Sequence, residues 1–251
     1  MTRYRWPMAL LLATLPLPLA AQEPADRAAN ADRWSGQVTI YAWGAGVGGD
    51  FTPFTGGPTL SFDKALGEVL KDLDAAFFAT GLARNGDLVL LTDLTYTKSS
   101  KDGLLPPGIP AAGEVSIRSL SLLGGKRFQA SDATTIDVLG GIRAWSLDGK
   151  VNVPLAGLAL APKESFVDPV AAVRLNSRIA PRLSFLAYGD VGGFGIGSDL
   201  TWQGVATLNY QASNAVYLSA GYRHLYLDRQ SGGASFAGSL SGPLAGVTLA
   251  F

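Results

Sequence analysis

The chain has a single histidine, His224, which is the first residue to consider for catalysis. A neutral imidazole can take the proton of a serine hydroxyl, and a nearby carboxylate completes the arrangement that many hydrolases use. Ser198, Ser235 and Asp228 are expected near the same end of neighbouring strands. No motif connects them to His224, so the sequence predicts a catalytic site only as an alternative.

A larger set of polar and ionisable residues recurs at alternate positions within apolar segments. Unpaired buried charge is destabilising, so its aspartates and arginines are expected to form ion-pair ladders in a shared interior. The register of the strand that carries Arg118 is ambiguous. The predicted interior network contains Asp93, Arg118, Asp137, Arg143, Asp168, Arg174, Asp190, Gln203 and Arg223, with Tyr188 and Asn209 beside it.

Composition argues against several other kinds of site. The chain has no cysteine, which excludes disulfides and thiol chemistry, and one histidine with scattered carboxylates predicts no metal site. The formal net charge is zero and there is no basic block, so nothing indicates nucleic-acid binding. Gly44, Gly46 and Gly49 match a dinucleotide-binding fingerprint, but Asp50 and Pro53 follow where a helix is required. We therefore predict no cofactor.

The elements that position these residues are clearest in residues 188–203, YGDVGGFGIGSDLTWQ. Apolar and polar side chains alternate on both sides of a glycine-rich centre. A period of two over both arms predicts a β-hairpin with a tight turn. Leu200, Trp202 and Leu208 then share one face, whereas Gln203 lies on the other.

The same alternation predicts ten strands along the chain. Their connections alternate in length, which is typical of outer-membrane barrels with short turns on one side and long loops on the other. The predicted strands are 34–51, 76–84, 88–97, 114–128, 134–147, 167–179, 183–194, 200–211, 216–228 and 235–251. The expected long loops are 52–75, 98–113, 148–166 and 229–234, with 195–199 as a short exception.

Composition favours the same fold. Charged residues make up 16% of the chain, against roughly 25% in a typical soluble domain. No apolar run in 34–251 reaches the ~20 residues of a membrane helix. We predict an all-β fold over 34–251, a closed antiparallel transmembrane β-barrel of about ten strands, with eight or twelve as alternatives. One short helix, capped by Ser61, is expected at 61–73 in the first long loop.

The N-terminus is predicted to be a cleaved signal peptide over residues 1–21. Arg3 and Arg5 precede a short apolar stretch, and Ala21 ends a small-residue cleavage site. The apolar stretch is too short for a membrane anchor. Residues 22–33 then form a polar, flexible leader, and the expected location is the outer membrane of a Gram-negative cell.

The C-terminal strand predicts how the chain enters that membrane. Alternating apolar residues end on Phe251, as in the terminal strand that the barrel-insertion machinery reads. Pro243 is expected at the outer rim, where water can meet its missing donor. Outer-membrane lipids are the other predicted partner. Interface belts are expected from Trp34, Trp43, Tyr96, Trp202, Tyr210, Tyr222 and Tyr226.

Residues 188–203 also resemble a motif, GDVGGFGxGSDxTWQ, of a little-characterised family of proteobacterial outer-membrane β-barrel proteins. The segment Val-Asp-Pro at 167–169, Gly-Tyr-Arg at 221–223 and the glycine-rich segment 242–246 resemble other strands of this family, and 61–74 resembles its helical segment. The resemblance implies a signal peptide and an outer-membrane barrel, and it implies no established biochemical activity.

The sequence therefore supports three functional hypotheses. The leading one is a monomeric outer-membrane barrel with a charge-paired polar lumen, acting either as a structural protein or as a narrow passive channel. An alternative is a lipid A or phospholipid hydrolase at the rim. A second alternative is a periplasmic, lipocalin-like binder of small ligands, in which the face of Leu200, Trp202 and Leu208 points into a cavity.

Overall fold

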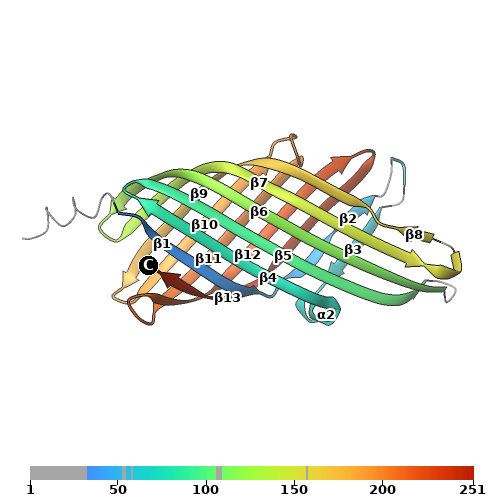
Figure 1. Ribbon diagram of the computed structural model, residues 1–251, viewed down its shortest axis with the longest axis horizontal. Helices are drawn as coiled ribbons and strands as arrows, with labels where there is room; N and C mark the ends of the chain where they lie inside the picture. The colour runs from blue at the N-terminus through green and yellow to red at the C-terminus, as the bar shows by residue number, and fades with distance from the viewer. Residues whose placement is uncertain (1–32, 53–54, 58, 106–108, 157) are drawn as a thin grey trace, which may run out of the picture.

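The chain forms a closed antiparallel β-barrel (Figure 1). A computed structural model describes residues 33–52, 55–57, 59–105, 109–156 and 158–251. Within these residues ten strands pair in chain order, and β1 closes the barrel against β13. This fold confirms the predicted class. The ten strands are β1 (Ser35–Trp43), β4 (Leu73–Asn85), β5 (Leu88–Leu105), β6 (Ile109–Ser131), β7 (Thr134–Val153), β9 (Lys163–Ala180), β10 (Leu183–Gly193), β11 (Leu200–Gln211), β12 (Val216–Ser231) and β13 (Ala234–Ala250).

Shorter elements lie at one end of the barrel (Figure 1). They are β2 (Gly46–Thr52), β3 (Leu60–Lys64), the helix α2 (Leu66–Asp72), the 3-10 turn η1 (Pro154–Ala156) and β8 (Leu158–Leu160). The helix is shorter than the predicted 61–73, because residues up to Lys64 pair with β2 as a strand. Its N-cap is therefore Ala65 and not Ser61, and the Glu68 carboxylate accepts a bond from the Ala65 N–H. No helix in the described ranges is long and apolar enough to cross a membrane.

The two ends of the barrel differ in their connections, as the sequence predicts. Short turns join β4 to β5, β6 to β7, β9 to β10 and β11 to β12 at one end, here called the short-turn end. At the other end, the long-hairpin end, strands extend beyond their predicted limits. The expected loops 98–113 and 148–166 are mostly strand, because β5 and β6 stay paired as far as Leu105 and Ile109 and β7 reaches Val153. The β10–β11 turn is the short exception at this end.

Predictions for residues 1–21 and for most of 22–33 fall outside the described residues. The signal peptide and the flexible leader therefore stay predictions. The described chain begins at Arg33 and enters β1 at Ser35, at the short-turn end of the barrel.

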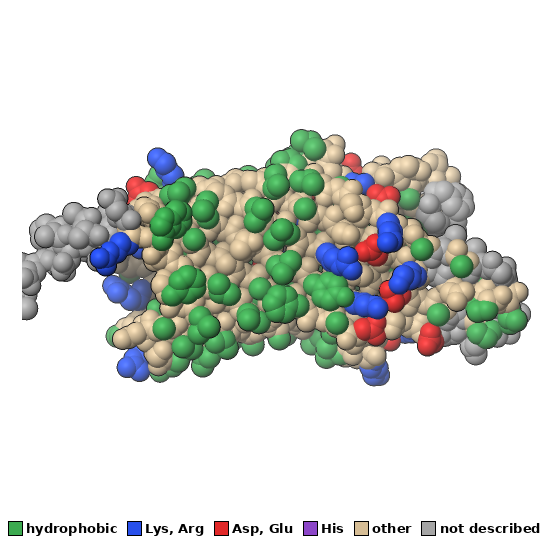
Figure 2. Space-filling model, viewed as in Figure 1, with side chains coloured by type: hydrophobic (Ala, Val, Ile, Leu, Met, Phe, Trp, Pro, Cys, Tyr) green, Lys and Arg blue, Asp and Glu red, His purple; other side chains and the backbone are tan. Residues whose placement is uncertain are grey.

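The outer face of the barrel carries a broad apolar band (Figure 2). Leu200, Trp202 and Leu208 are all exposed on it. That orientation is opposite to the one that a lipocalin-like binder needs, so this alternative is wrong. Further exposed apolar side chains include Val38, Ile40, Leu90, Leu94, Leu120, Leu122, Val138, Ile142, Val173, Leu218, Val247 and Leu249.

Pro243 lies inside β13, within the predicted strand 235–251, and its position at the outer rim of the membrane stays a prediction. The strand continues from Pro243 back to Ala234 and pairs with β2 over that part. The Gly44 N–H donates to the Pro243 carbonyl at 2.9 Å, but proline has no N–H with which to return the bond. β1 ends at Trp43 and β2 begins at Gly46. The missing donor is thus accommodated by a break in the facing strand.

Gly242 is expected to be essential at this break. A Cβ at Gly242 would lie 1.8 Å from the Gly44 carbonyl oxygen, so Gly242→Ala must displace backbone. We expect it to destabilise the barrel by about 1–3 kcal/mol, as overpacking does, measured as a lower urea midpoint. Gly204→Ala is the matched control, because a Cβ there would have no neighbour within 4 Å. Equal midpoints for the two variants would contradict the close approach.

Candidate functional site

The predicted interior network lies inside the barrel, apart from Arg118. The other eight predicted members are buried, and several are almost inaccessible: Arg143 is 2% exposed and Asp168 is 0% exposed. They come from six different strands between β5 and β12. Their side chains point inward because apolar neighbours at alternate positions point outward.

Arg118 lies on the outer face, so its predicted place in the network is wrong. Its side chain is 57% exposed, its guanidinium lies 3.7 Å from Asp148, and it covers the Tyr96 ring at 5.7 Å. Ser119 and Ser121 are the buried positions in this part of β6. The strand therefore has the opposite register to the one that would bring Arg118 inside.

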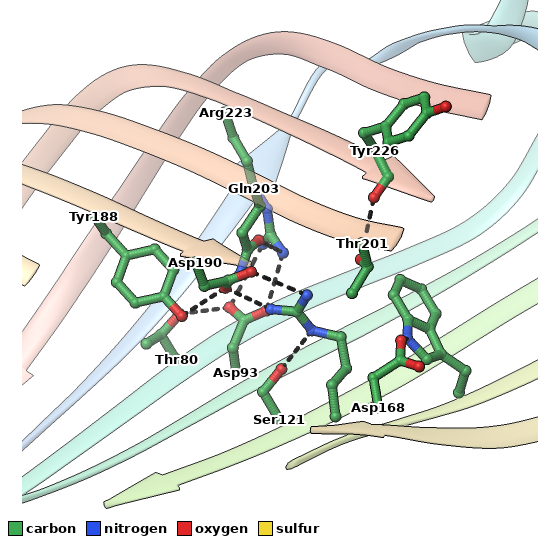
Figure 3. A network of polar contacts seen from close by, with 12 residues as sticks. Thr80, Asp93, Ser121, Asp168, Tyr188, Asp190, Thr201, Gln203, Arg223 and Tyr226 are labelled. Atoms are coloured by element: carbon green, nitrogen blue, oxygen red, sulfur yellow. Dashed lines mark hydrogen bonds and ion pairs between the residues drawn. The ribbon is translucent and has the colours of Figure 1, made fainter. Parts of the chain in front are cut away.

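Asp190 is the centre of one half of the buried network (Figure 3). Arg143 binds it through both terminal nitrogens, at 3.2 Å and 2.6 Å, and its Nε donates to Ser121 Oγ at 2.9 Å. Tyr188 OH and Gln203 Nε2 donate to the same carboxylate, each at 2.6 Å. Four donor groups from three side chains therefore hold the Asp190 charge, and bidentate geometry makes the arginine pair strong.

Asp93 is the centre of the other half (Figure 3). Arg223 Nη2 donates to Asp93 Oδ1 at 3.0 Å and to Gln203 Oε1 at 2.7 Å. Thr80 and Tyr41 donate to the second carboxylate oxygen, at 3.0 Å and 3.2 Å. Gln203 thus connects both halves, with its amide nitrogen on one aspartate and its oxygen on the opposite arginine.

The two halves form one layer across the lumen, here called the central layer. Side chains from eight of the ten barrel strands contribute to it within the described chain, and β9 and β13 are the two that do not. Its members are Tyr41, Thr80, Asp93, Ser121, Arg143, Tyr188, Asp190, Gln203 and Arg223. Two arginines and two aspartates leave the layer electrically balanced.

Asp137 forms a second ion-pair group nearer the short-turn end. Arg127 binds both of its oxygens, at 2.7 Å and 2.9 Å, and Arg174 binds one at 3.0 Å. Sequence reasoning missed Arg127, although it lies an even number of positions from the inward-facing Ser121 on β6 and so points to the same side. Once the register of this strand is known, the same alternation identifies it.

Asp168 is held without a cation among the described side chains. It accepts bonds from Trp145 Nε1 at 2.9 Å and from the backbone N–H and the hydroxyl of Ser198 at 2.6 Å and 2.9 Å. Ser198 belongs to the β10–β11 turn, so this turn is anchored inside the barrel. A Cβ at Gly197 would lie 2.4 Å from the Asp168 carboxylate, which explains the glycine next to the anchor.

Side chains from β9 and β12, the strands on either side of the β10–β11 hairpin, contact each other across this turn. Arg229 on β12 pairs with Glu164 on β9 at 3.0 Å, although β10 and β11 lie between the two strands in the sheet. Its guanidinium also covers the Phe166 ring at 3.9 Å and donates to the Gly197 carbonyl. The ion pair between Arg229 and Glu164 thus spans the short β10–β11 turn.

An aromatic layer lies between the central layer and the long-hairpin end. Trp43 packs against Phe78, and Trp145 stacks on Phe166 with ring centres 6.1 Å apart. Trp43 is buried here and does not belong to an outer belt, which corrects its predicted position. The buried members of this layer are Trp43, Ala45, Phe78, Trp145, Phe166, Leu225, Leu227 and Leu244.

A polar cavity of about 270 Å³ lies on the other side of the central layer. Arg223 and Asp93 form part of its lining next to the layer, and Gln37, Asn176 and Tyr217 line it nearer the short-turn end. The central and aromatic layers lie between this cavity and the long-hairpin end.

His224 does not meet the serines or the aspartate proposed as its partners. Ser198 is buried against Asp168, whereas Ser235 and Asp228 lie toward the ends of β13 and β12. Its Nδ1 instead contacts Ser241 Oγ on β13, and its ring stacks on Trp202 at 4.5 Å. Sequence reasoning missed Ser241, which the antiparallel register places directly opposite His224.

Outside the apolar band, three carboxylates are each shared by two cations. Asp72 binds Lys64 at 2.9 Å and Lys101 at 3.2 Å, and hydrogen bonds from these lysines lower the pKa of the Asp72 carboxyl. Glu114 is held in the same way by Lys150 and Lys98, which lower its pKa. The third is Asp148, with Arg118 and Lys163. Figure 2 shows such a mixed band of charge beside the apolar surface. No group of three or more metal-ligating residues occurs in the described part of the chain.

Comparisons with known proteins agree with the fold. No protein-family model and no curated protein matches the chain. Among solved structures, the outer membrane protease OmpT from Escherichia coli has a TM-score of 0.53 and 8% identity, covering 88% of this chain and 97% of that chain. The translocator domain of the autotransporter NalP from Neisseria meningitidis has a TM-score of 0.45 and 12% identity, covering 86% of this chain and 88% of that one. The similarity to OmpT supports the shared barrel fold.

Asp190→Ala should leave Arg143 as an unpaired buried cation. Breaking a buried ion pair from one side costs about 3–5 kcal/mol, so we expect a clearly lower urea midpoint and loss of the heat-resistant folded band on electrophoresis. Arg118→Ala, which breaks an exposed pair, should cost only about 0–1 kcal/mol. If both variants unfold at the wild-type midpoint, the central layer does not stabilise the barrel.

Asp168→Ala should release the β10–β11 turn. It orphans Trp145 Nε1 and both donors of Ser198, and a buried unsatisfied group costs about 1–3 kcal/mol. Phe194, exposed at the turn, should then become a chymotrypsin site while the barrel stays folded. Asp199→Ala is the control, because Asp199 accepts only an exposed bond from the Gln230 N–H in the same region. Equal cleavage rates at Phe194 would rule out the anchor.

Proposed function

We propose that this chain is an outer-membrane β-barrel protein whose closed interior has a structural, non-transporting role. The observation that carries the proposal is the central layer, which draws on eight strands and leaves its arginines and aspartates almost without solvent contact. An open pore would hydrate these side chains. A narrow channel is the competing outcome, and conductance measurements separate the two.

The proposed location rests on four features. The outer face carries an apolar band, whereas a soluble monomer rarely exposes a large contiguous apolar surface. Pairing of β1 with β13 closes the barrel, which satisfies the strand edges that lipid would otherwise expose. Residues 1–21 read as a signal peptide, and the terminal Phe251 reads as a signal for the barrel-insertion machinery. The similarity to OmpT agrees with this location. The proposed protein is a monomer surrounded by outer-membrane lipids.

Closure is supported by two layers of different chemistry in series. The central layer excludes water by pairing its charges, and the aromatic layer fills the lumen beyond it with ring contacts such as that between Trp145 and Phe166. Small barrels of about eight to ten strands hold little more than side chains, and bulk flow needs about 16–18 strands. The cavity on the short-turn side is then a dead-end vestibule.

The full chain, inserted in a planar bilayer, should show no discrete conductance steps at moderate voltage. Ions cannot cross the central layer without separating Arg223 from Asp93 and Arg143 from Asp190. The same preparation must be checked for folded protein by heat-modifiable electrophoresis, so that a silent recording reports on the barrel. Discrete, reproducible openings of the folded protein would replace the structural role with that of a channel.

A further inference from the structure

His224 and Ser241 form a polar pair on the apolar outer face of the barrel. The neighbours of His224 along β12, Arg223 and Leu225, are buried inside, so its own side chain points outward. Ser241 lies directly opposite on β13, and its Oγ contacts His224 Nδ1. Polar groups facing lipid are unfavourable unless they are hydrogen-bonded. Bonding alone does not explain why an imidazole stands there.

The surroundings of the pair fix the ring and its level in the membrane. The imidazole stacks on Trp202, with ring centres 4.5 Å apart, and Tyr226 lies 6.4 Å from Trp202 on the same face. Outward Trp and Tyr side chains mark the boundary between acyl chains and headgroups. The acyl-ester groups of lipids lie at that boundary, so the pair faces ester carbonyls.

A recess on the outer face gives a lipid chain access to the serine. Ser241 lines it together with Tyr222 and Gly46, and the charged side chains of Asp63 and Lys64 line it as well. The glycines of β2 leave the wall without side chains where this strand runs beside β13. The recess thus has both apolar and charged lining, as an amphiphilic lipid requires.

We propose that Ser241 is a nucleophile and His224 its general base in a site that cleaves acyl esters of membrane lipids. A serine is activated when an adjacent imidazole accepts its proton, and this contact is already made here. The Trp202 ring acts as the positioning residue, because stacking holds the imidazole plane beside Ser241.

The proposed reaction is hydrolysis in two steps. Ser241 Oγ attacks the ester carbonyl carbon and gives its proton to His224, and the bond from that carbon to the alkoxy oxygen breaks as His224 returns the proton to the leaving alcohol. Interfacial water then attacks the acyl carbon and gives its proton to His224, and the bond from that carbon to Ser241 Oγ breaks as His224 returns the proton to Oγ. One ester and one water become one fatty acid and one alcohol.

Labelling with a fluorophosphonate tests the nucleophile in the folded full chain. The wild type should form an adduct that peptide mass spectrometry places on Ser241, and Ser241→Ala should abolish it. His224→Gln should slow labelling by about 10²-fold or more, as expected for loss of a general base. Ser146→Ala is the matched control, because this serine also faces outward, between the inward-packed Trp145 and Leu147, and has no imidazole partner among the described side chains; its labelling should equal that of the wild type.

Two vesicle arms identify the lipid. Vesicles of phosphatidylethanolamine and phosphatidylglycerol test glycerophospholipid esters, and vesicles containing lipid A test the acyl esters of a glycolipid; fatty acid release above that of Ser241→Ala in either arm supports the proposal. Wild-type labelling no faster than that of Ser241→Ala, or no release above that variant in both arms, overturns it. Electrophoretic heat-modifiability must match between the variants. Conductance is independent of this outcome, so failure here leaves the closed barrel standing.

Discussion

The neutralisation of buried charge is the constraint on which the interior of this barrel depends. A guanidinium or a carboxylate deprived of water is tolerated only where hydrogen bonds and opposite charge replace the lost hydration. The barrel meets this requirement in two ways: arginine forks bind Asp93, Asp137 and Asp190, whereas neutral donors hold Asp168. The planar, permanently charged guanidinium suits the first task because it can bind two oxygens at once. Since the partners come from different strands, each pair also fixes how the wall is closed.

The faces of the strands could be predicted from alternation alone where polar and apolar residues contrast strongly. β11 has its predicted bounds, and Gln203 points inward with Leu208 outward. Prediction was wrong where the contrast is weak. In β6, serines and glycines occupy positions on both faces and give little contrast in polarity. The sequence therefore does not decide which face carries Arg118, and it does not identify Arg127 as an interior residue. The partners of Asp168 could not be predicted either, because Ser198 comes from a turn and its position depends on how the whole barrel is staggered.

The inner and outer faces of the barrel wall differ in their side-chain chemistry. The interior gathers charge into a balanced layer, with the aromatic layer on its long-hairpin side and a cavity on its short-turn side. In the closed barrel proposed above, stability and closure come from the same side chains. Most outward side chains along the strands are apolar as far as the outer charge band, and the contacting pair of His224 and Ser241 departs from that pattern. Because successive residues of a strand face opposite sides of the wall, a single barrel wall can carry both the closed interior and the outward-facing site proposed above.

The anchored β10–β11 turn has a consequence for how this barrel can vary. Hairpins at the long-hairpin end project beyond the wall, and such exposed tips tolerate inserted or exchanged sequence. The turn at 194–199 is different, because Ser198 bonds inside the barrel and Arg229 crosses above it to Glu164. The length of this turn is therefore constrained by the contacts that Ser198 makes inside the barrel. Changes of length in the long hairpins would therefore leave the interior intact, whereas a change of length at 194–199 would remove Ser198 from Asp168.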